Sequence, residues 1–314
     1  MLAIPLLLAS TASAQEGPEL HGLWMPTSQV RPVDEPDAAP AGAEAALTSW
    51  GLSTPTPPIR LIEDRWVLAN ILAFEHTRTR IGGAGFLAGD EATQDLFRIQ
   101  WGLASVWTPS DRATVAVLVQ PGIYSDLAGP FGVDDMGLVA LALGVWKFSD
   151  GFALGLGGGS VQFFGRPTLT PLLSLTAETG RLSVSLLLPQ EGAVWVRLAD
   201  AASIGVRGSF DGGFYHVRPD DSRLPEAYQT YSVLTAGPVL QLTLRDRLIV
   251  ELDGGLAPLR TLDVYADRDT RVLAMSLEPG WSLAATLRVA MGQPADEEEP
   301  AEAADDSADE DQSD

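Results

Sequence analysis

The chain contains no cysteine among its 314 residues. Disulfides, thiolate metal sites and acylation of an N-terminal lipobox cysteine are therefore excluded. Past its N-terminus the chain also lacks any run of 18 apolar residues, so no transmembrane helix is expected. Basic residues are few, with 20 Lys and Arg against 42 Asp and Glu, and they form no basic patch. Nucleic acid binding is therefore not expected.

Two terminal segments differ from the rest of the sequence. Residues 1–14 read MLAIPLLLASTASA, an apolar stretch that ends in the small-x-small form of a signal-peptidase site. We expect these residues to be a signal peptide; the alternative, a buried N-terminal helix, is disfavoured by Pro5. Residues 293–314 hold eleven acidic residues and no basic one, which is half of the net charge of -22. Such a segment cannot bury enough apolar surface to fold, so 292–314 is predicted to be a disordered acidic tail.

Between these segments, residues 15–291 show the alternation typical of β-strands. From about Trp66 onward, runs of roughly 10 to 15 residues alternate apolar and polar side chains and end in turn residues. Thr170–Pro189, TPLLSLTAETGRLSVSLLLP, contains two such runs around a Thr-Gly turn. In another run, both sets of alternating residues, which would lie on opposite faces of a strand, are apolar. One set is large and the other is Ala or Gly: Val139, Leu141, Leu143 and Val145 against Ala140, Ala142 and Gly144. We expect the leucine-rich face of each strand to contact lipid and the Thr- and Gly-rich face to line an enclosed interior.

Alternation also fits a secreted β-sandwich, which remains the alternative. Three features favour a barrel. The runs are long enough to cover an apolar band of about 25 Å, tight turns alternate with longer loops, and the polar parity carries charges that a sandwich core could not hold unpaired. We therefore predict an all-β fold: an antiparallel transmembrane β-barrel of about 12 to 14 strands over residues 15–291. Its first strand, Leu20–Val30, should close onto Met275–Val289.

Ten charged residues fall on the polar parity and are candidates for a lumen-facing set. They are Arg98, Arg112, Glu178, Arg197, Arg207, Asp211, Glu251, Asp253, Glu278 and Arg288. Five of each sign cancel, whereas a pore that selects one ion sign would show a one-sided ring, so we expect a paired network. Glu251 and Asp253 lie about 7 Å apart on one strand face, and a nearby arginine would make them a structural pair.

No catalytic constellation is visible in the sequence. Asn70 and His76 share a face of one predicted strand but lie about 20 Å apart, too far for one site, and His216 falls in the long segment after Asp211. We expect no enzymatic activity, no cofactor and no metal site, and a barrel enzyme is the third hypothesis after a barrel and a secreted sandwich.

Three stretches resemble an uncharacterised family of Gram-negative outer-membrane β-barrels, classified as a domain of unknown function. They are VQPGIYSDL (Val119–Leu127), LALGVWKFSDGFALGLGG (Leu141–Gly158) and LSVSLLLPQEGAVWVRL (Leu182–Leu198). The resemblance covers about Trp66 to Met291 and implies a barrel in the bacterial outer membrane. Its expected partners are outer-membrane lipid and, during biogenesis, the barrel-assembly machinery. We expect the protein to act as a narrow channel or as a structural or interaction module. The sequence does not identify a substrate.

Overall fold

The computed structural model describes residues 15–31, 42–62, 65–83, 91–162, 164–218, 226–245 and 247–291. The predicted signal peptide, 1–14, and the predicted acidic tail, 292–314, lie outside the described residues. No helix in the described part of the chain is long and apolar enough to cross a membrane. The elements are β1 (Gln15–Gln29), β2 (Glu44–Pro55), β3 (Ile59–Leu61), β4 (Trp66–Gly82), β5 (Glu91–Ser110), β6 (Ala113–Ser125), η1 (Val133–Asp135), β7 (Met136–Ser149), β8 (Phe152–Val161), β9 (Thr168–Thr179), β10 (Leu182–Leu188), β11 (Glu191–Ala199), β12 (Ala202–Val217), β13 (Ala227–Leu244), β14 (Leu248–Tyr265), β15 (Arg271–Ser276) and β16 (Gly280–Met291).

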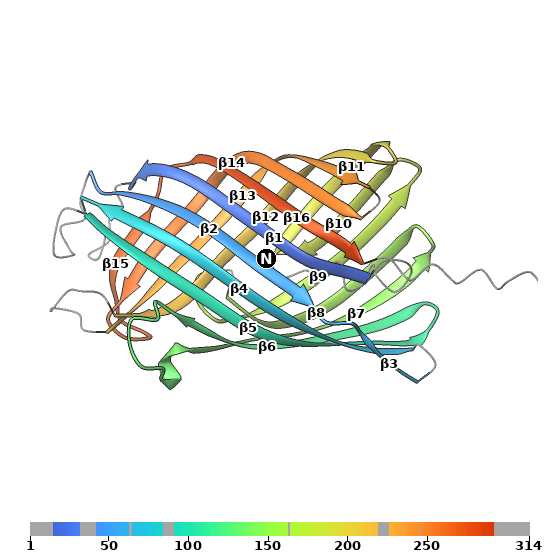
Figure 1. Cartoon of the computed structure of the whole chain (residues 1–314), viewed down its shortest axis with the longest axis horizontal. Coiled ribbons are helices and arrows are strands. Elements are labelled where there is room, and N and C mark those ends of the chain that lie inside the picture. Colours follow the sequence, from blue (N-terminus) through green and yellow to red (C-terminus); the bar gives the residue numbers. More distant parts are fainter. Residues whose placement is uncertain are drawn as a thin grey trace, which may run out of the picture.

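Fourteen of these strands form a closed antiparallel ring, tilted against the long axis (Figure 1). Each ring strand pairs with its neighbours in the sequence, and β1 closes the ring on β16, with Leu20 opposite Leu287. The two remaining strands continue ring strands after a break: β3 pairs with β4 beyond the end of β2, and β15 pairs with β14 beyond β16. The predicted barrel, its strand number and its seam are therefore confirmed.

The connections alternate in length, as the sequence predicted. Tight turns follow β5, β7, β9, β11 and β13, and they lie at the same end of the barrel as Gln15 and Met291. We call this the turn end. The opposite end, which we call the loop end, carries the longer connection 126–135. Short periplasmic turns and longer surface loops are the typical arrangement in outer-membrane barrels.

The outer surface of the ring is apolar between two levels of aromatic side chains. In β6, Val115, Val117 and Val119 are exposed, whereas Ala116 and Leu118 between them are buried in the interior. On β5, Trp107 lies toward the turn end, and Phe97, ten residues along the strand, contacts the rings of His76 and Phe74 toward the loop end. At a rise of about 3.4 Å and a tilt of about 40°, these levels are about 25 Å apart, which matches the apolar band of a transmembrane barrel.

Strand β7 shows where the parity expectation was wrong. Val139, Leu141 and Leu143 are buried inside the barrel, and the smaller Ala142 and Gly144 are exposed on its outer surface. The physical reason is packing between neighbouring strands. Leu141 and Leu143 join an apolar cluster on the inner wall, whose other buried members are Ala69, Ala104, Leu118, Leu172 and Leu187. Large side chains fill the interior there, so the rule that leucine faces lipid fails on this strand.

The loop end of the barrel is narrowed and filled. Beyond Phe210, β12 leaves β11 and crosses to β6, where His216 pairs in parallel with Ser125 and the His216 carbonyl accepts the Asp126 amide at 3.2 Å. The space enclosed by this narrower ring is a packed apolar core. Its largest fully buried side chains include Met25, Leu96, Tyr215, Tyr231, Leu262 and Met275. The axial route through the loop end is therefore occupied by protein.

The outer and inner faces of the barrel wall predict different outcomes for a substitution to arginine, tested on β6 and on β10. Val119 lies on the outer surface midway between the aromatic levels, so Val119→Arg should lower the free energy of unfolding by about 2 to 4 kcal/mol. Ser185→Arg, which faces the wide part of the lumen, should cost much less. Urea unfolding of the protein in phospholipid vesicles, followed by tryptophan fluorescence, measures both. Equal costs for the two variants would contradict the assigned faces.

Candidate functional site

Three cavities lie in line in the described part of the barrel interior. The largest, about 430 Å³, lies toward the turn end and is lined mainly by polar side chains; we call it the vestibule. A middle cavity of about 90 Å³ lies between β1, β2, β12, β13, β14 and β16. The third, of about 80 Å³, is lined by four glutamines and is called the glutamine cavity. The vestibule and the middle cavity share Arg207, and the two smaller cavities share His21, Phe210 and Asp211.

Arg207 holds together the acidic residues between the vestibule and the middle cavity. It donates to Glu251 at 2.7 Å and to Asp253 at 3.3 Å, and its guanidinium stacks over Trp195 at 5.4 Å. Both carboxylates come from β14, two strands away from β12, and Gly237 stands opposite Arg207 on the intervening strand. Arg207 is thus the nearby arginine that would make Glu251 and Asp253 a structural pair. The pair is therefore braced rather than free to hold a cation.

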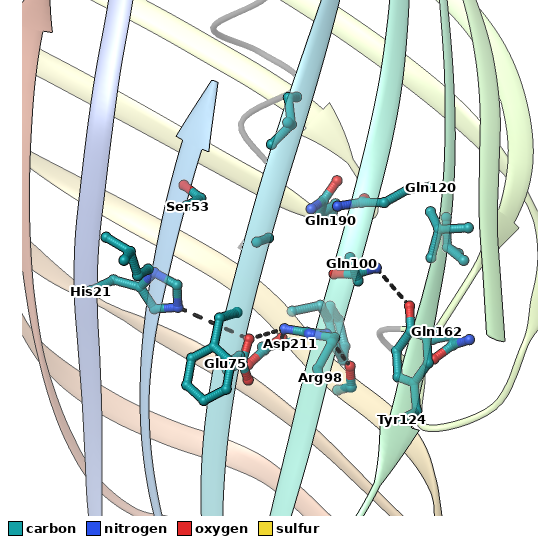
Figure 2. A pocket seen from close by; sticks show the side chains of 18 of the residues that line it. His21, Ser53, Glu75, Arg98, Gln100, Gln120, Tyr124, Gln162, Gln190 and Asp211 are labelled. Carbon is teal, nitrogen blue, oxygen red and sulfur yellow. Dashed lines mark hydrogen bonds and ion pairs between the residues drawn. The ribbon is translucent and has the colours of Figure 1, made fainter. Parts of the chain in front are cut away.

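A second ion-pair cluster lies between the middle cavity and the glutamine cavity. Glu75 and Arg98 face each other in register across β4 and β5 and form a buried ion pair. Glu75 also accepts hydrogen bonds from Ser49 at 3.2 Å and Tyr231 at 3.1 Å. Arg98 extends from the same cluster toward Asp211, at 3.8 Å (Figure 2). Side chains from β2, β4, β5, β12 and β13 are thus tied together across the lumen.

The glutamine cavity is lined by both polar and apolar side chains. Its glutamines are Gln100, Gln120, Gln162 and Gln190 (Figure 2). Gln100 donates to the Tyr124 hydroxyl at 2.6 Å. The Oε1 atoms of Gln120 and Gln162 are buried without a hydrogen-bond partner in the described part of the protein. A buried amide oxygen left unpaired costs about 1 to 3 kcal/mol, so the cavity favours an occupant that donates hydrogen bonds.

The structure brings six of the ten predicted residues into these lumen networks: Arg98, Arg207, Asp211, Glu251, Asp253 and Arg288. Glu178 and Arg197 line the vestibule and are exposed. The last two are not in the lumen networks. Arg112 lies exposed in the turn after β5, and Glu278 lies exposed between β15 and β16, where its carbonyl oxygen accepts from Arg260.

Sequence analysis missed several residues that complete the networks. Glu75 is the partner of Arg98, and Glu19 accepts from Arg288 at 3.0 Å. His21 lines both small cavities. Glu19 and His21 belong to an N-terminal run with weak alternation, so the sequence did not predict which of its side chains face the lumen. Gln162 and Gln190 lie in connections, where alternation carries no information about direction.

Polar contacts hold the end of β12, where it crosses to β6, against η1. His216 Nδ1 lies 3.0 Å from Asp135, and Arg218 lies 3.2 Å from the same carboxylate. Burial raises the pKa of the Asp135 carboxyl, but hydrogen bonds from Ser125 and Arg218 outweigh burial and hold that pKa well below its ordinary value. The stabilisation from this carboxylate is therefore present at neutral pH and is lost only as the pH falls through the lowered pKa.

A closed ring with an apolar outer surface and a charged, partly hollow interior defines a transmembrane β-barrel protein. The chain belongs to the DUF6268 family, a domain of unknown function, whose pattern matches residues 87–293. This finding confirms the resemblance to an uncharacterised barrel family. No curated protein matches the chain.

The chain is also similar, at low identity, to several solved structures. The COG4313 outer membrane channel from Pseudomonas putida F1 is 10% identical, with a TM-score of 0.42 over 90% of this chain and 98% of that one. The Pseudomonas putida toluene transporter TodX is 11% identical, with a TM-score of 0.34 over 88% of this chain and 90% of that one. The β domain of the Bordetella autotransporter Brka is 9% identical, with a TM-score of 0.34 over 87% and 98%. The fold assignment above rests on the strand pairings of this chain.

The Glu75–Arg98 pair predicts a non-additive pair of substitutions. Arg98→Met leaves Glu75 buried without its cation and should lower the free energy of unfolding by about 3 to 5 kcal/mol. Adding Glu75→Gln to that variant should restore much of the loss, because the uncompensated charge is gone. Urea unfolding of both single variants and the double variant measures the coupling. If the double variant loses the sum of the two single losses, the two side chains do not act as a pair.

Proposed function

We propose that the protein resides in the outer membrane of a Gram-negative cell, with its turn end toward the periplasm. Three observations support this orientation and location. The ring is closed and has an apolar band of about 25 Å on its outer surface. The predicted signal peptide would direct export. Gln15 and Met291 both lie at the end that carries the tight turns, which face the periplasm in outer-membrane barrels.

We further propose that the barrel is a narrow passage for small uncharged molecules, held closed in this structure. The observation that supports the passage is the line of three cavities, in which neighbouring cavities share lining side chains. A barrel with a purely structural role has no need of such a line. Between the cavities, arginines are paired with carboxylates, so neither sign of charge dominates and selection for one ion sign is not favoured.

A structural or interaction module is the second candidate, because the loop end is filled by a packed core. In that case the small inner cavities would be isolated voids. We propose no catalytic role and no cofactor for either candidate. Outer-membrane lipid and the barrel-assembly machinery remain the proposed partners.

Single-cysteine variants separate the two candidates, because the natural chain has no cysteine. Ser185→Cys reports on the vestibule, Thr235→Cys on the middle cavity and Gln120→Cys on the glutamine cavity. A passage predicts that iodoacetamide, which is small, uncharged and water-soluble, alkylates all three in vesicles, fastest in the vestibule. Adding Arg207→Ala should accelerate only the two inner sites, since Arg207 stands between them and the vestibule.

Val119→Cys, on the outer surface, is the matched control and should react slowly with this reagent. Heat-modifiable migration on gels shows that each variant is folded. Alkylation confined to Ser185→Cys, with and without Arg207→Ala, would reject the passage and favour the structural module.

A further inference from the structure

The wall of the barrel has uneven height. β10 has 7 residues and β11 has 9, whereas β12 has 16 and β13 has 18. At about 3.3 Å per residue and a tilt of about 40°, β10 rises only about 18 Å from the turn end and β12 rises about 40 Å. The connection at Pro189 and Gln190 therefore lies at the depth of the apolar band, not above it.

Two strand edges are left open above this short hairpin. The last residue of β9 paired with β10 is Leu173, so Thr168–Leu172 extends beyond its neighbour. On the other side, β12 pairs with β11 only as far as Ser209 and then crosses toward β6. The resulting gap, which we call the side opening, spans three strand spacings, or about 14 Å. Open sheet edges at membrane depth occur only where protein covers them or where they line a cavity.

At the side opening, side chains cover the open edges and a cavity lies behind them. Phe164, from the connection after β8, lies against Phe210 of β12 with the ring centroids 5.3 Å apart. Behind this aromatic pair, Gln162 and Gln190 are 5% and 8% exposed, and both line the glutamine cavity together with Phe210. A thin layer of side chains thus separates the cavity from the outer surface.

The rim of the side opening is suited to contact with lipid. Leu169 on β9 is 84% exposed, and Leu188 at the end of β10 is 42% exposed. Pro171, on the open edge, has no amide hydrogen to leave unsatisfied. By contrast, the axial route past Tyr215 and Tyr231 is closed by the packed core of the loop end. The line of cavities therefore leads to the side of the barrel.

We propose that the side opening is a lateral doorway between the glutamine cavity and the outer leaflet of the membrane, with Phe164 and Phe210 as its movable barrier. This inference rests on the passage proposed above and gives its exit.

The chemistry of the cavity indicates the class of molecule that would use the doorway. Gln120 and Gln162 present buried oxygens that lack donors, and the apolar side chains of Val139, Leu141 and Val161 line the same cavity. The cavity of about 80 Å³ has room for about five water-sized positions. It fits a small, uncharged, amphipathic molecule with an apolar body and an O–H or N–H donor.

The test uses a Gln190→Cys variant in vesicles, alone and combined with Phe164→Ala. N-cyclohexylmaleimide partitions into lipid, whereas iodoacetamide stays in water. A doorway to lipid predicts that Phe164→Ala raises the maleimide rate about tenfold, equivalent to removing about 1.4 kcal/mol from the opening barrier, and leaves the iodoacetamide rate unchanged. Phe148→Ala is the matched control, because Phe148 is also an exposed aromatic, near the turn end, and should change neither rate.

Each other outcome overturns the doorway in a distinct way. If Phe164→Ala leaves both rates unchanged while the Gln120→Cys variant still reacts with iodoacetamide, the passage stands and its exit is elsewhere. Equal acceleration of both reagents would mean that the opening leads to water rather than to lipid. If neither reagent reaches any inner cysteine, with all variants folded, the passage and the doorway fail together.

Discussion

Closure of the hydrogen-bonded ring is the constraint on which the rest of the structure depends. In a bilayer no water is available to satisfy backbone amides and carbonyls, so each strand must pair on both sides except where protein covers its edge or the edge lines a cavity. The seam between β1 and β16, which joins the two ends of the chain, meets this requirement. Once the ring is closed, alternate residues face lipid or lumen, and the apolar outer band and the polar interior follow from that geometry.

The lumen is kept narrow by interactions between distant strands. Arg207 reaches carboxylates on β14, and the Glu75–Arg98 pair meets Tyr231 of β13 and Asp211 of β12. These links satisfy charges that would otherwise be buried without partners, and they leave small cavities between them. At the loop end the same role passes to apolar packing, which closes the axis. At the short β10–β11 hairpin, neither ion pairs nor a packed apolar core fill the wall. Only a few side chains close the gap there.

Much of the fold could be predicted from sequence because it depends on local periodicity. The two runs predicted within Thr170–Pro189 form the hairpin of β9 and β10, and the ring closes where the apolar runs indicated. The orientation of β7 could not be predicted, since both its faces are apolar and the choice depends on packing against Leu118 of β6, Leu172 of β9 and Leu187 of β10. The candidate site was predicted only in part. Charges on strongly alternating strands were placed in the lumen, but their partners Glu75 and Glu19, and the crossing of β12 to β6, depend on contacts between segments far apart in the sequence.

The most direct test of the account is a disulfide across the seam of the ring. Leu23 on β1 pairs with Ala284 on β16, and the natural chain has no other thiol that could compete. In the Leu23→Cys/Ala284→Cys variant, mild oxidation of folded, membrane-extracted protein should link the two cysteines and change the migration of the denatured chain, reversibly with reductant. Folded protein whose two thiols stay reduced and freely alkylated under those conditions would contradict a closed barrel.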